Sequence, residues 1–382
     1  MTRVLGVGIM GAGVISGQYM QYAPLFRTFE LRSVADIIPE RSAARSKQFG
    51  VPDQTPEALL ANPEVDVVLN LTPPTVHYQV TMAALAAGKH AFSEKPLAVN
   101  MEQARDIAGT AATKSLRVGS APDTFLGGSH QQVRQLVDSG RVGRIVSGTA
   151  HVMSRGMEHW HPNPDFFFQP GGGPVLDVGP YYVMDLIQLL GPVRRVTAFT
   201  ATARAERPVT AEGPFQGTTI KVGTPTTIHG LLEFHSGAVV TIGTSWDVLA
   251  HGHHNIELYG TEGSIFPPDP NFFGGDIVVA DRTGRRETVA PWGHPLSVPN
   301  EPANDRNPPR ANYRSTGLAD MCDAIANGRP ARCGIDVALH AVEVMTSLLG
   351  AGERAEIITL TTTCERPAPL GPDEARALLR SA

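Results

Sequence analysis

Lys95, Asp177 and Tyr181 are three residues whose types and positions could move a proton together. Lys95 follows a short apolar segment in HAFSEKP, and Asp177 and Tyr181 lie four residues apart in GGGPVLDVGPYYVMD. Residues with this spacing share one face if the segment is a single helix, and the glycines before them let the chain approach a cleft. A phenol is a poor base at neutral pH, but a nearby ammonium group stabilises its phenolate form. The three residues therefore indicate acid–base chemistry at a hydroxyl or carbonyl group.

Each of these residues also has an ordinary structural explanation. Lys95 could be a solvated amine, and Tyr181 and Tyr182 could be packing residues of a buried helix. Lys95 follows a predicted parallel strand, at the sheet edge where ligands gather in open α/β folds, and this favours a chemical role. Tyr182 has no comparable argument, so we expect it to pack.

The first third of the chain predicts the scaffold for Lys95. From residue 3 to residue 120, short segments rich in β-branched residues alternate with helical patterns that end on glycine or a turn. Strands that alternate with helices are typical of βαβ units with a parallel sheet. We therefore expect an α/β fold that opens with a Rossmann domain over residues 1–122.

A glycine-rich turn, GAGVIS, joins the first predicted strand to the first helix. Gly11 allows a tight turn, and Gly13 allows a pyrophosphate to approach backbone N–H groups near Val14 and Ile15 at the helix N-terminus. Ser16 stands where a third glycine is usual, which is tolerable because serine is small. Glycine-rich turns also occur for steric reasons alone, so this motif is weak by itself.

Asp36 strengthens the prediction of a dinucleotide site. It ends the next strand, 23 residues after Gly13 (36 minus 13), where a carboxylate accepts the ribose hydroxyls and repels a 2′-phosphate. The cofactor is therefore expected to be NAD, with NADP disfavoured. The alternative is that Asp36 is a helix cap or turn residue.

Two further motifs, T-P-P-x-x-H (Thr72, Pro73, His77) and E-K-P (Glu94, Lys95), follow the next two predicted strands. Together with the glycine turn, the segment 171–191 and the segment 315–330, they resemble the glucose-fructose oxidoreductase and inositol dehydrogenase family, Gfo/Idh/MocA. The combination is specific, although no single motif is.

The resemblance implies a role for each motif. It implies that Gly11, Gly13, Val14, Ile15, Asp36, Thr72, Pro73, His77, Glu94 and Lys95 bind the cofactor. It implies catalysis by Lys95, Asp177 and Tyr181, with Tyr181 in the place of the family's usual histidine. Beside the positive ring of the oxidised cofactor, Lys95 is expected to favour its neutral form.

The resemblance also implies a second α/β domain over residues 123–382, with a large, open, mostly antiparallel sheet that commonly serves oligomerisation. β-rich segments joined by turns such as HSGA and DRTG supply its strands, and two helical stretches after residue 315 should pack back near the domain junction. The segment 291–313, rich in proline and asparagine, reads as a long crossing loop. We expect a homodimer or homotetramer.

Three acidic or imidazole side chains are candidates for substrate contact. Asp123 lies at the predicted domain crossover, where it would disfavour an anionic substrate, and His161 and Asp165 precede the glycine run in EHWHPNPDFFF. A loop of aromatic and proline packing is the alternative for His161 and Asp165. The crowded HGHH at 251–254 has no carboxylate set nearby, so no metal site is expected.

The composition excludes several other classes of protein. The 32 Lys and Arg residues against 37 Asp and Glu leave a formal net charge of −5, which provides no basic surface for nucleic acid or anionic membrane. We find no run of 18 or more apolar residues and therefore expect no membrane span. Three cysteines without a C-x-x-C spacing favour a reducing, cytoplasmic environment.

These observations favour an NAD-dependent dehydrogenase or reductase that acts on a secondary alcohol or ketone of a neutral sugar, glycoside or cyclic polyol. Two alternatives stay open: a glycosidase that uses NAD transiently, and a non-catalytic regulator that senses the dinucleotide.

Overall fold

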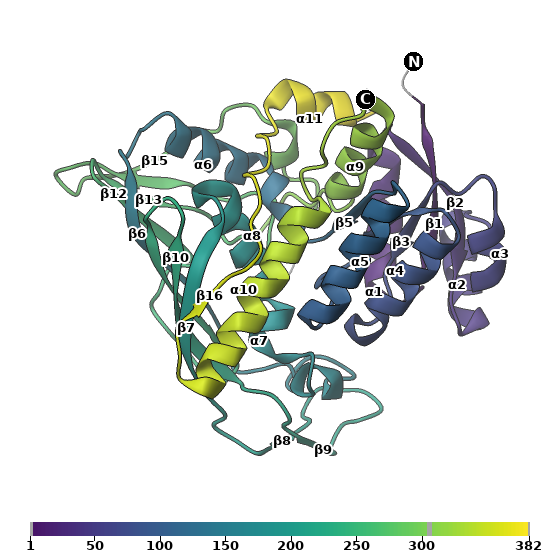
Figure 1. Ribbon diagram of the computed structural model, residues 1–382, viewed down its shortest axis with the longest axis horizontal. Helices are drawn as coiled ribbons and strands as arrows, with labels where there is room; N and C mark the ends of the chain where they lie inside the picture. Colours follow the sequence, from purple (N-terminus) through teal and green to yellow (C-terminus); the bar gives the residue numbers. More distant parts are fainter. Residues whose placement is uncertain (1–2, 304–307, 381–382) are drawn as a thin grey trace.

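The computed structural model describes residues 3–303 and 308–380. The first third of the chain forms a five-stranded parallel sheet in the order β2-β1-β3-β4-β5 (Figure 1). Its strands are β1 (Leu5–Met10), β2 (Phe29–Ala35), β3 (Val67–Asn70), β4 (His90–Ser93) and β5 (Val118–Ser120). The expected Rossmann topology is confirmed, and the apolar run that opens the sequence is its buried first strand.

Helices connect these strands and cover the sheet. They are α1 (Val14–Tyr22), α2 (Pro39–Phe49), α3 (Pro56–Ala61), α4 (His77–Ala86) and α5 (Met101–Thr113). Local signals fix their ends: Asn100 accepts the N–H of Gln103 to begin α5, and Gly50 ends α2 in the left-handed region. Helix α3 could not be predicted from the sequence, because six residues are too few for a helical period to show.

The second sheet has nine strands in the order β15-β14-β13-β12-β6-β11-β10-β7-β16. Within this sheet, only β6 and β11 pair in parallel among the described strands, so the sheet is mostly antiparallel, as expected. Its strands are β6 (Ile145–Met153), β7 (Val193–Ala201), β10 (Thr227–Phe234), β11 (Val239–Ser245), β12 (Ile256–Gly260), β13 (Ser264–Phe266), β14 (Val278–Ala280), β15 (Arg286–Thr288) and β16 (Ile358–Thr359). A separate ribbon pairs β8 (Glu206–Pro208) with β9 (Thr219–Lys221).

One face of the second sheet is covered by helices. The later helices are α6 (Gly128–Asp138), α7 (Gly173–Asp177), α8 (Gly179–Leu190), α9 (Thr316–Asn327), α10 (Ile335–Arg354) and α11 (Pro372–Leu378). Short 3₁₀ turns are η1 (Ala23–Leu25), η2 (Pro74–Val76), η3 (Thr124–Leu126), η4 (Asp165–Phe168) and η5 (Pro295–Ser297). The segment 291–313 holds η5 and is otherwise irregular, and residues 304–307 within it lie outside the described residues.

Helix α10 joins the two sheets. It runs diagonally between them (Figure 1) and packs on β7, α8 and α5. By length and composition α10 could cross a membrane, but 56% of its most apolar window is buried inside the molecule. Helix α10 is therefore interpreted as a core helix of this fold. Helices α9 and α10, from the C-terminal part of the chain, also contact β5 of the Rossmann sheet. The domain boundary expected at residue 122 stays a prediction.

Candidate active site

The glycine turn between β1 and α1 leaves an opening for a ligand. Gly11 has φ +102°, and a Cβ added there would lie 2.8 Å from the backbone of Leu71. Gly13 precedes α1, and a Cβ added to it would meet no described atom within 4 Å. Val14 in the first turn is 86% exposed. Gly11 is therefore required by the fold, whereas the space at Gly13 suits a diphosphate against free N–H groups.

Asp36 lies directly beside this turn. One carboxylate oxygen accepts the N–H of Ala12 at 2.7 Å, and the other accepts the N–H of Ile38 at 2.8 Å. Asp36 therefore does act as a turn residue, as the alternative explanation expected. The same hydrogen bonds hold its carboxylate at the edge of the opening over the glycine turn. These residues fit the adenosine and diphosphate portions of a dinucleotide.

His77 connects the T-P-P and E-K-P segments and is fully buried. Its Nδ1 lies 2.7 Å from the carbonyl oxygen of Pro96, and its Nε2 lies 2.7 Å from that of Thr72. Burial lowers the pKa of His77. Both ring nitrogens are engaged with backbone, so the residue positions the two loops, and its expected contact with the cofactor stays a prediction. Asn70, which the sequence analysis missed, holds the same turn by accepting a hydrogen bond from the Thr72 hydroxyl at 2.6 Å.

Lys95 extends from the end of β4 to the other half of the site. Its Nζ donates to the Asp177 carboxylate at 2.7 Å and to the Asp177 backbone carbonyl, and it lies 5.5 Å from the centroid of the Tyr181 ring. Burial opposes the charge, but Asp177, Tyr181 and Glu94 outweigh it and raise the pKa of Lys95. Without a cofactor, these neighbours therefore favour the charged ammonium held by Asp177, and the neutral form expected beside an oxidised nicotinamide stays a prediction.

Asp177 and Tyr181 come from two consecutive helices. Asp177 is the last residue of α7, and Tyr181 lies in the first turn of α8, which begins with Gly179 and Pro180. The single continuous helix that their spacing assumed is interrupted at Val178, a turn residue between α7 and α8. Both residues still meet Lys95, so the break aims two side chains at one amine.

Tyr182 points elsewhere. It is 1% exposed, and its hydroxyl accepts a hydrogen bond from Asn255 at 2.7 Å and lies 3.5 Å from an Asp269 carboxylate oxygen. Burial, with the charge of Asp269, raises the pKa of Tyr182 well above its usual value. The packing role predicted for it agrees with this burial.

The three expected substrate residues lie in different surroundings. His161 packs edge-on against Phe166 and Phe167, and burial lowers its pKa although Asp177 acts in the opposite direction. Asp165 is exposed and accepts a hydrogen bond from Gln169 at 3.1 Å. Neither side chain has a described hydrogen bond to Lys95, Asp177 or Tyr181, so their contact with substrate stays a prediction.

Asp123 requires a correction. Its side chain is fully buried, and one oxygen accepts the N–H groups of Ser315 at 3.1 Å and Gly317 at 3.0 Å. The carboxylate therefore caps the start of α9, and burial raises its pKa. It cannot offer its charge to a substrate in the cleft from this position.

Glu94 and Arg314 form a second ion pair behind Lys95. Glu94 accepts hydrogen bonds from the backbone N–H of Lys95 at 2.9 Å, the Tyr19 hydroxyl at 2.9 Å and the Arg314 guanidinium at 3.1 Å. These contacts hold Glu94 against the backbone of Lys95, and the expected contact of Glu94 with the cofactor stays a prediction. The sequence analysis missed Arg314 because it lies 220 residues from Glu94 in an irregular segment.

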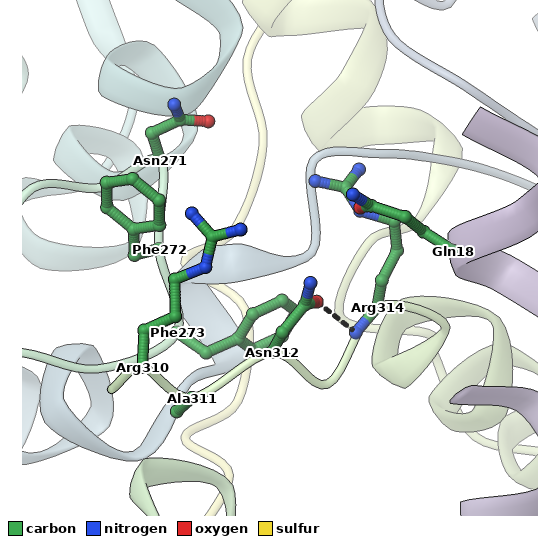
Figure 2. Close-up of a pocket in the computed structure, with 8 residues that line it drawn as sticks. All are labelled: Gln18, Asn271, Phe272, Phe273, Arg310, Ala311, Asn312 and Arg314. Carbon is green, nitrogen blue, oxygen red and sulfur yellow. Dashed lines mark hydrogen bonds between the residues drawn. The ribbon is translucent and has the colours of Figure 1, made fainter. Parts of the chain in front are cut away.

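Arg314 also lines a polar cavity between α1 and the second sheet domain. The cavity has a volume of about 140 Å³. Figure 2 shows that Gln18 of α1 lines one side of it and that two loops of the C-terminal part line the other. Its lining residues are Gln18, Asn271, Phe272, Phe273, Arg310, Ala311, Asn312 and Arg314. Amide and guanidinium groups dominate it, so it can hydrogen-bond a hydroxylated ligand. In the described ranges, no cluster of three His, Cys, Asp or Glu side chains is suited to a metal ion.

Several known proteins are similar to this chain in sequence or in fold. The D-glucoside 3-dehydrogenase of Escherichia coli is 29% identical over 274 residues, which cover 69% of this chain and 77% of that protein. The 1,5-anhydro-D-fructose reductase of Ensifer adhaerens is 25% identical over 362 residues, which cover 92% and 98%. The structure of a levoglucosan dehydrogenase with NADH and L-sorbose has the same fold, with a TM-score of 0.75 and 23% identity over 94% of this chain and 100% of that one.

Two family models match most of the chain. The model of the oxidoreductase family with an NAD-binding Rossmann fold matches residues 5–121, and the model of the GFO/IDH/MocA C-terminal domain matches residues 130–266. The glycine turn and Lys95 lie in the first match, and Asp177 and Tyr181 lie in the second. The chain therefore belongs to the GFO/IDH/MocA family of NAD-binding oxidoreductases.

Proposed function

We propose that this enzyme uses NAD to interconvert a secondary alcohol and a ketone on a neutral sugar, glycoside or cyclic polyol. One observation carries the proposal. Lys95, at the ligand-binding edge of the Rossmann sheet, meets Asp177 and Tyr181 from the second domain. A charged lysine, its carboxylate partner and a phenol at this edge are the parts needed for proton transfer beside a nicotinamide.

The residues of the chain would act as follows. The bound dinucleotide supplies a hydride acceptor or donor at its nicotinamide ring. During oxidation the Tyr181 phenolate takes the proton of the substrate hydroxyl and becomes the phenol, and during reduction the phenol gives that proton to the carbonyl oxygen and becomes the phenolate. The Lys95 ammonium stabilises the phenolate form in both directions. Asp177 holds the Lys95 ammonium at 2.7 Å and so fixes its direction.

The assignment of substrate class rests on the relatives and on the charges of the cavity. The similar proteins are named for a glucoside, an anhydro-sugar and levoglucosan, all neutral polyhydroxylated molecules. The two cavity arginines are both already paired, Arg310 with Glu301 and Arg314 with Glu94. A neutral ligand leaves these pairs intact, whereas an anionic one would compete for them.

NAD is proposed over NADP because of Asp36. Its carboxylate lies beside the glycine turn, where a 2′-phosphate would meet a negative charge at close range. Gly11, Gly13, Val14, Ile15, Thr72 and Pro73 would hold the cofactor through backbone groups around that turn.

The proposal is tested by an absorbance screen for NADH. Inositols, aldoses, anhydro-sugars and glycosides are each incubated with the enzyme and NAD or NADP, and products are identified by mass spectrometry. We expect net NADH formation with at least one neutral polyhydroxylated substrate. Release of an aglycone without net NADH would support the NAD-dependent glycosidase instead. NAD binding without turnover on any substrate would support the non-catalytic regulator.

A further inference from the structure

We propose that Arg45 is a positioning residue for the cofactor, holding the Gly13 peptide so that the N–H of Val14 faces the diphosphate of the dinucleotide. The inference rests on the proposed function and adds to it a residue of α2 that belongs to no motif predicted for the cofactor site. It also gives a reason why Ser16 stands where a third glycine is usual.

The guanidinium of Arg45 reaches from α2 to the glycine turn. Its Nη2 donates to the Gly13 carbonyl oxygen at 3.0 Å, and its Nε donates to the Ser16 hydroxyl at 3.0 Å. The Ser16 hydroxyl in turn donates to the Gly13 carbonyl oxygen at 2.6 Å. These three hydrogen bonds are compatible, because a hydroxyl group can donate one hydrogen bond while it accepts another. Two donors therefore hold the Gly13 carbonyl oxygen.

Both helices keep the guanidinium in this place. On α2, the Gln48 side chain accepts a hydrogen bond from Arg45 Nη1 at 2.7 Å. On α1, a Cβ added to Gly17 would lie 3.1 Å from the same nitrogen, so the glycine leaves room for the guanidinium. Glycine is unfavourable inside a helix, and the close approach of Arg45 accounts for its presence at this position.

The direction of the Gly13 carbonyl fixes the direction of the next N–H. A trans peptide is planar, so its N–H points away from its C=O. Because the carbonyl oxygen is held on the side of Arg45 and Ser16, the Val14 N–H points to the opposite side. Val14 is the first residue of α1, so this N–H has no acceptor within the helix. The opening at Gly13 lies at this end of α1, and the network therefore orients a free donor where the diphosphate is proposed to bind.

A glycine at position 16 would complete the usual fingerprint but would lose this network. Ser16 is fully buried, and its hydroxyl takes part in two of the three hydrogen bonds. Without the hydroxyl, the Gly13 carbonyl loses a donor and Arg45 Nε loses its acceptor. The departure from glycine is thus coupled to Arg45, 29 residues later in the chain.

Dinucleotide binding tests the inference without any sugar. Arg45→Met keeps an apolar stem and removes the donors, and we expect the Kd for NADH, measured by fluorescence titration, to rise about tenfold. Ser16→Ala should raise this Kd about threefold, since the Gly13 carbonyl keeps only one donor. Ser16→Gly restores the usual fingerprint and should nevertheless weaken NADH binding at least as much as Ser16→Ala.

Lys47→Met is the matched control. It removes a positive charge from the same helix at an exposed position. Residues two apart do not face each other on a helix, so Lys47 does not share the face from which Arg45 reaches the glycine turn. The Kd for NADH in this variant should stay within a factor of about two of the wild-type value.

Adenosine separates positioning of the turn from a general loosening of the domain. It lacks the diphosphate, so its affinity, measured by displacement of NADH, should not depend on the Val14 N–H. In Arg45→Met we expect it to stay within a factor of about two of the wild-type value. Wild-type NADH affinity in Arg45→Met, or equal losses for NADH and adenosine, would overturn the inference. Should Arg45→Met fail to fold, unchanged or tighter NADH binding in Ser16→Ala and Ser16→Gly would overturn it equally.

These titrations also separate the inference from the proposed function. A wild type that turns over no polyol, with the expected loss in Arg45→Met, would contradict the proposed reaction and support the role of Arg45. An active wild type with unchanged NADH affinity in Arg45→Met would contradict the role of Arg45 alone. A wild type that binds neither NADH nor NADPH would contradict both.

Discussion

The Lys95 ammonium determines which group can carry the proton. It donates to both the carboxylate and the backbone carbonyl of Asp177, and its neighbours raise its pKa despite burial. A raised pKa favours the charged form of Lys95, which suits a group that supports a base rather than the base itself. We therefore propose Tyr181, whose ring lies 5.5 Å from the Lys95 Nζ, as the group that takes and returns the proton.

Lys95, Asp177 and Tyr181 could be predicted as site residues from the sequence. The ion pair of Glu94 and Arg314 behind Lys95 could not. Lys95 and Tyr181 stood out because they occupy motif positions. Arg314 did not, because an arginine in a segment rich in proline and asparagine gives no local signal. Its partner Glu94 lies in another part of the chain, and only the folded chain brings the two together. Asp123 was misjudged for a related reason: nothing in its local sequence shows that it caps a helix 193 residues later (316 minus 123).

Cofactor preference is a prediction at the scale of one residue. Asp36→Asn removes the charge but keeps oxygen and nitrogen atoms near Ala12 and Ile38. We expect NADP to bind at least about tenfold more tightly to this variant, because the repulsion of a 2′-phosphate is lost. Fluorescence titration with both cofactors measures this effect. Unchanged NADP affinity would mean that another group excludes the 2′-phosphate.

At the scale of elements, breaks between helices and strands place the site. The turn from β1 to α1 opens the glycine loop, and the break at Val178 separates Asp177 on α7 from Tyr181 on α8. The βαβ alternation could be read from the sequence because each strand and helix has its own hydrophobic period. The break at Val178 could not be predicted from the sequence, because a spacing of four residues between Asp177 and Tyr181 is equally compatible with one helix or two.

The glycine turn gives a stability prediction for an element. Gly11→Ala forces an alanine into φ +102° and brings its Cβ within 2.8 Å of Leu71. We expect a loss of at least about 3 kcal/mol in the free energy of unfolding, since strain and overpacking add. Gly88→Ala is the matched control, because Gly88 has φ +74° but open space around it. It should lose only about 1 kcal/mol. Equal losses in urea unfolding would show that close packing at Leu71 is unimportant.

At the scale of the whole molecule, helix α10 ties the Rossmann sheet to the second sheet and so holds Lys95 opposite Tyr181. On the face of the second sheet away from α10, several large apolar side chains are exposed. Phe199, Leu231 and Val239 on β7, β10 and β11 are 77%, 45% and 40% exposed there. Large apolar side chains on an open sheet face indicate a protein interface.

We therefore predict that this face joins subunits in a homodimer or homotetramer. Light scattering coupled to size exclusion should give the mass of a dimer or tetramer for the wild type. Phe199→Glu combined with Leu231→Glu should yield monomers, because the charges cannot be buried unpaired. Val298→Glu, at a 56% exposed position on the crossing loop, should leave the mass unchanged. A monomeric wild type would contradict the prediction.

The central claim is that Tyr181 carries the proton at an NAD-dependent site, and Tyr181→Phe tests it most directly. The change removes one hydroxyl and keeps the ring beside Lys95. We expect kcat to fall by about 10²–10⁴-fold, the usual contribution of a general acid or base, while NAD affinity measured by calorimetry stays within a factor of about three, or ~0.7 kcal/mol. Tyr182→Phe, on the adjacent residue, should keep kcat near the wild-type value. Wild-type turnover in Tyr181→Phe would contradict the account.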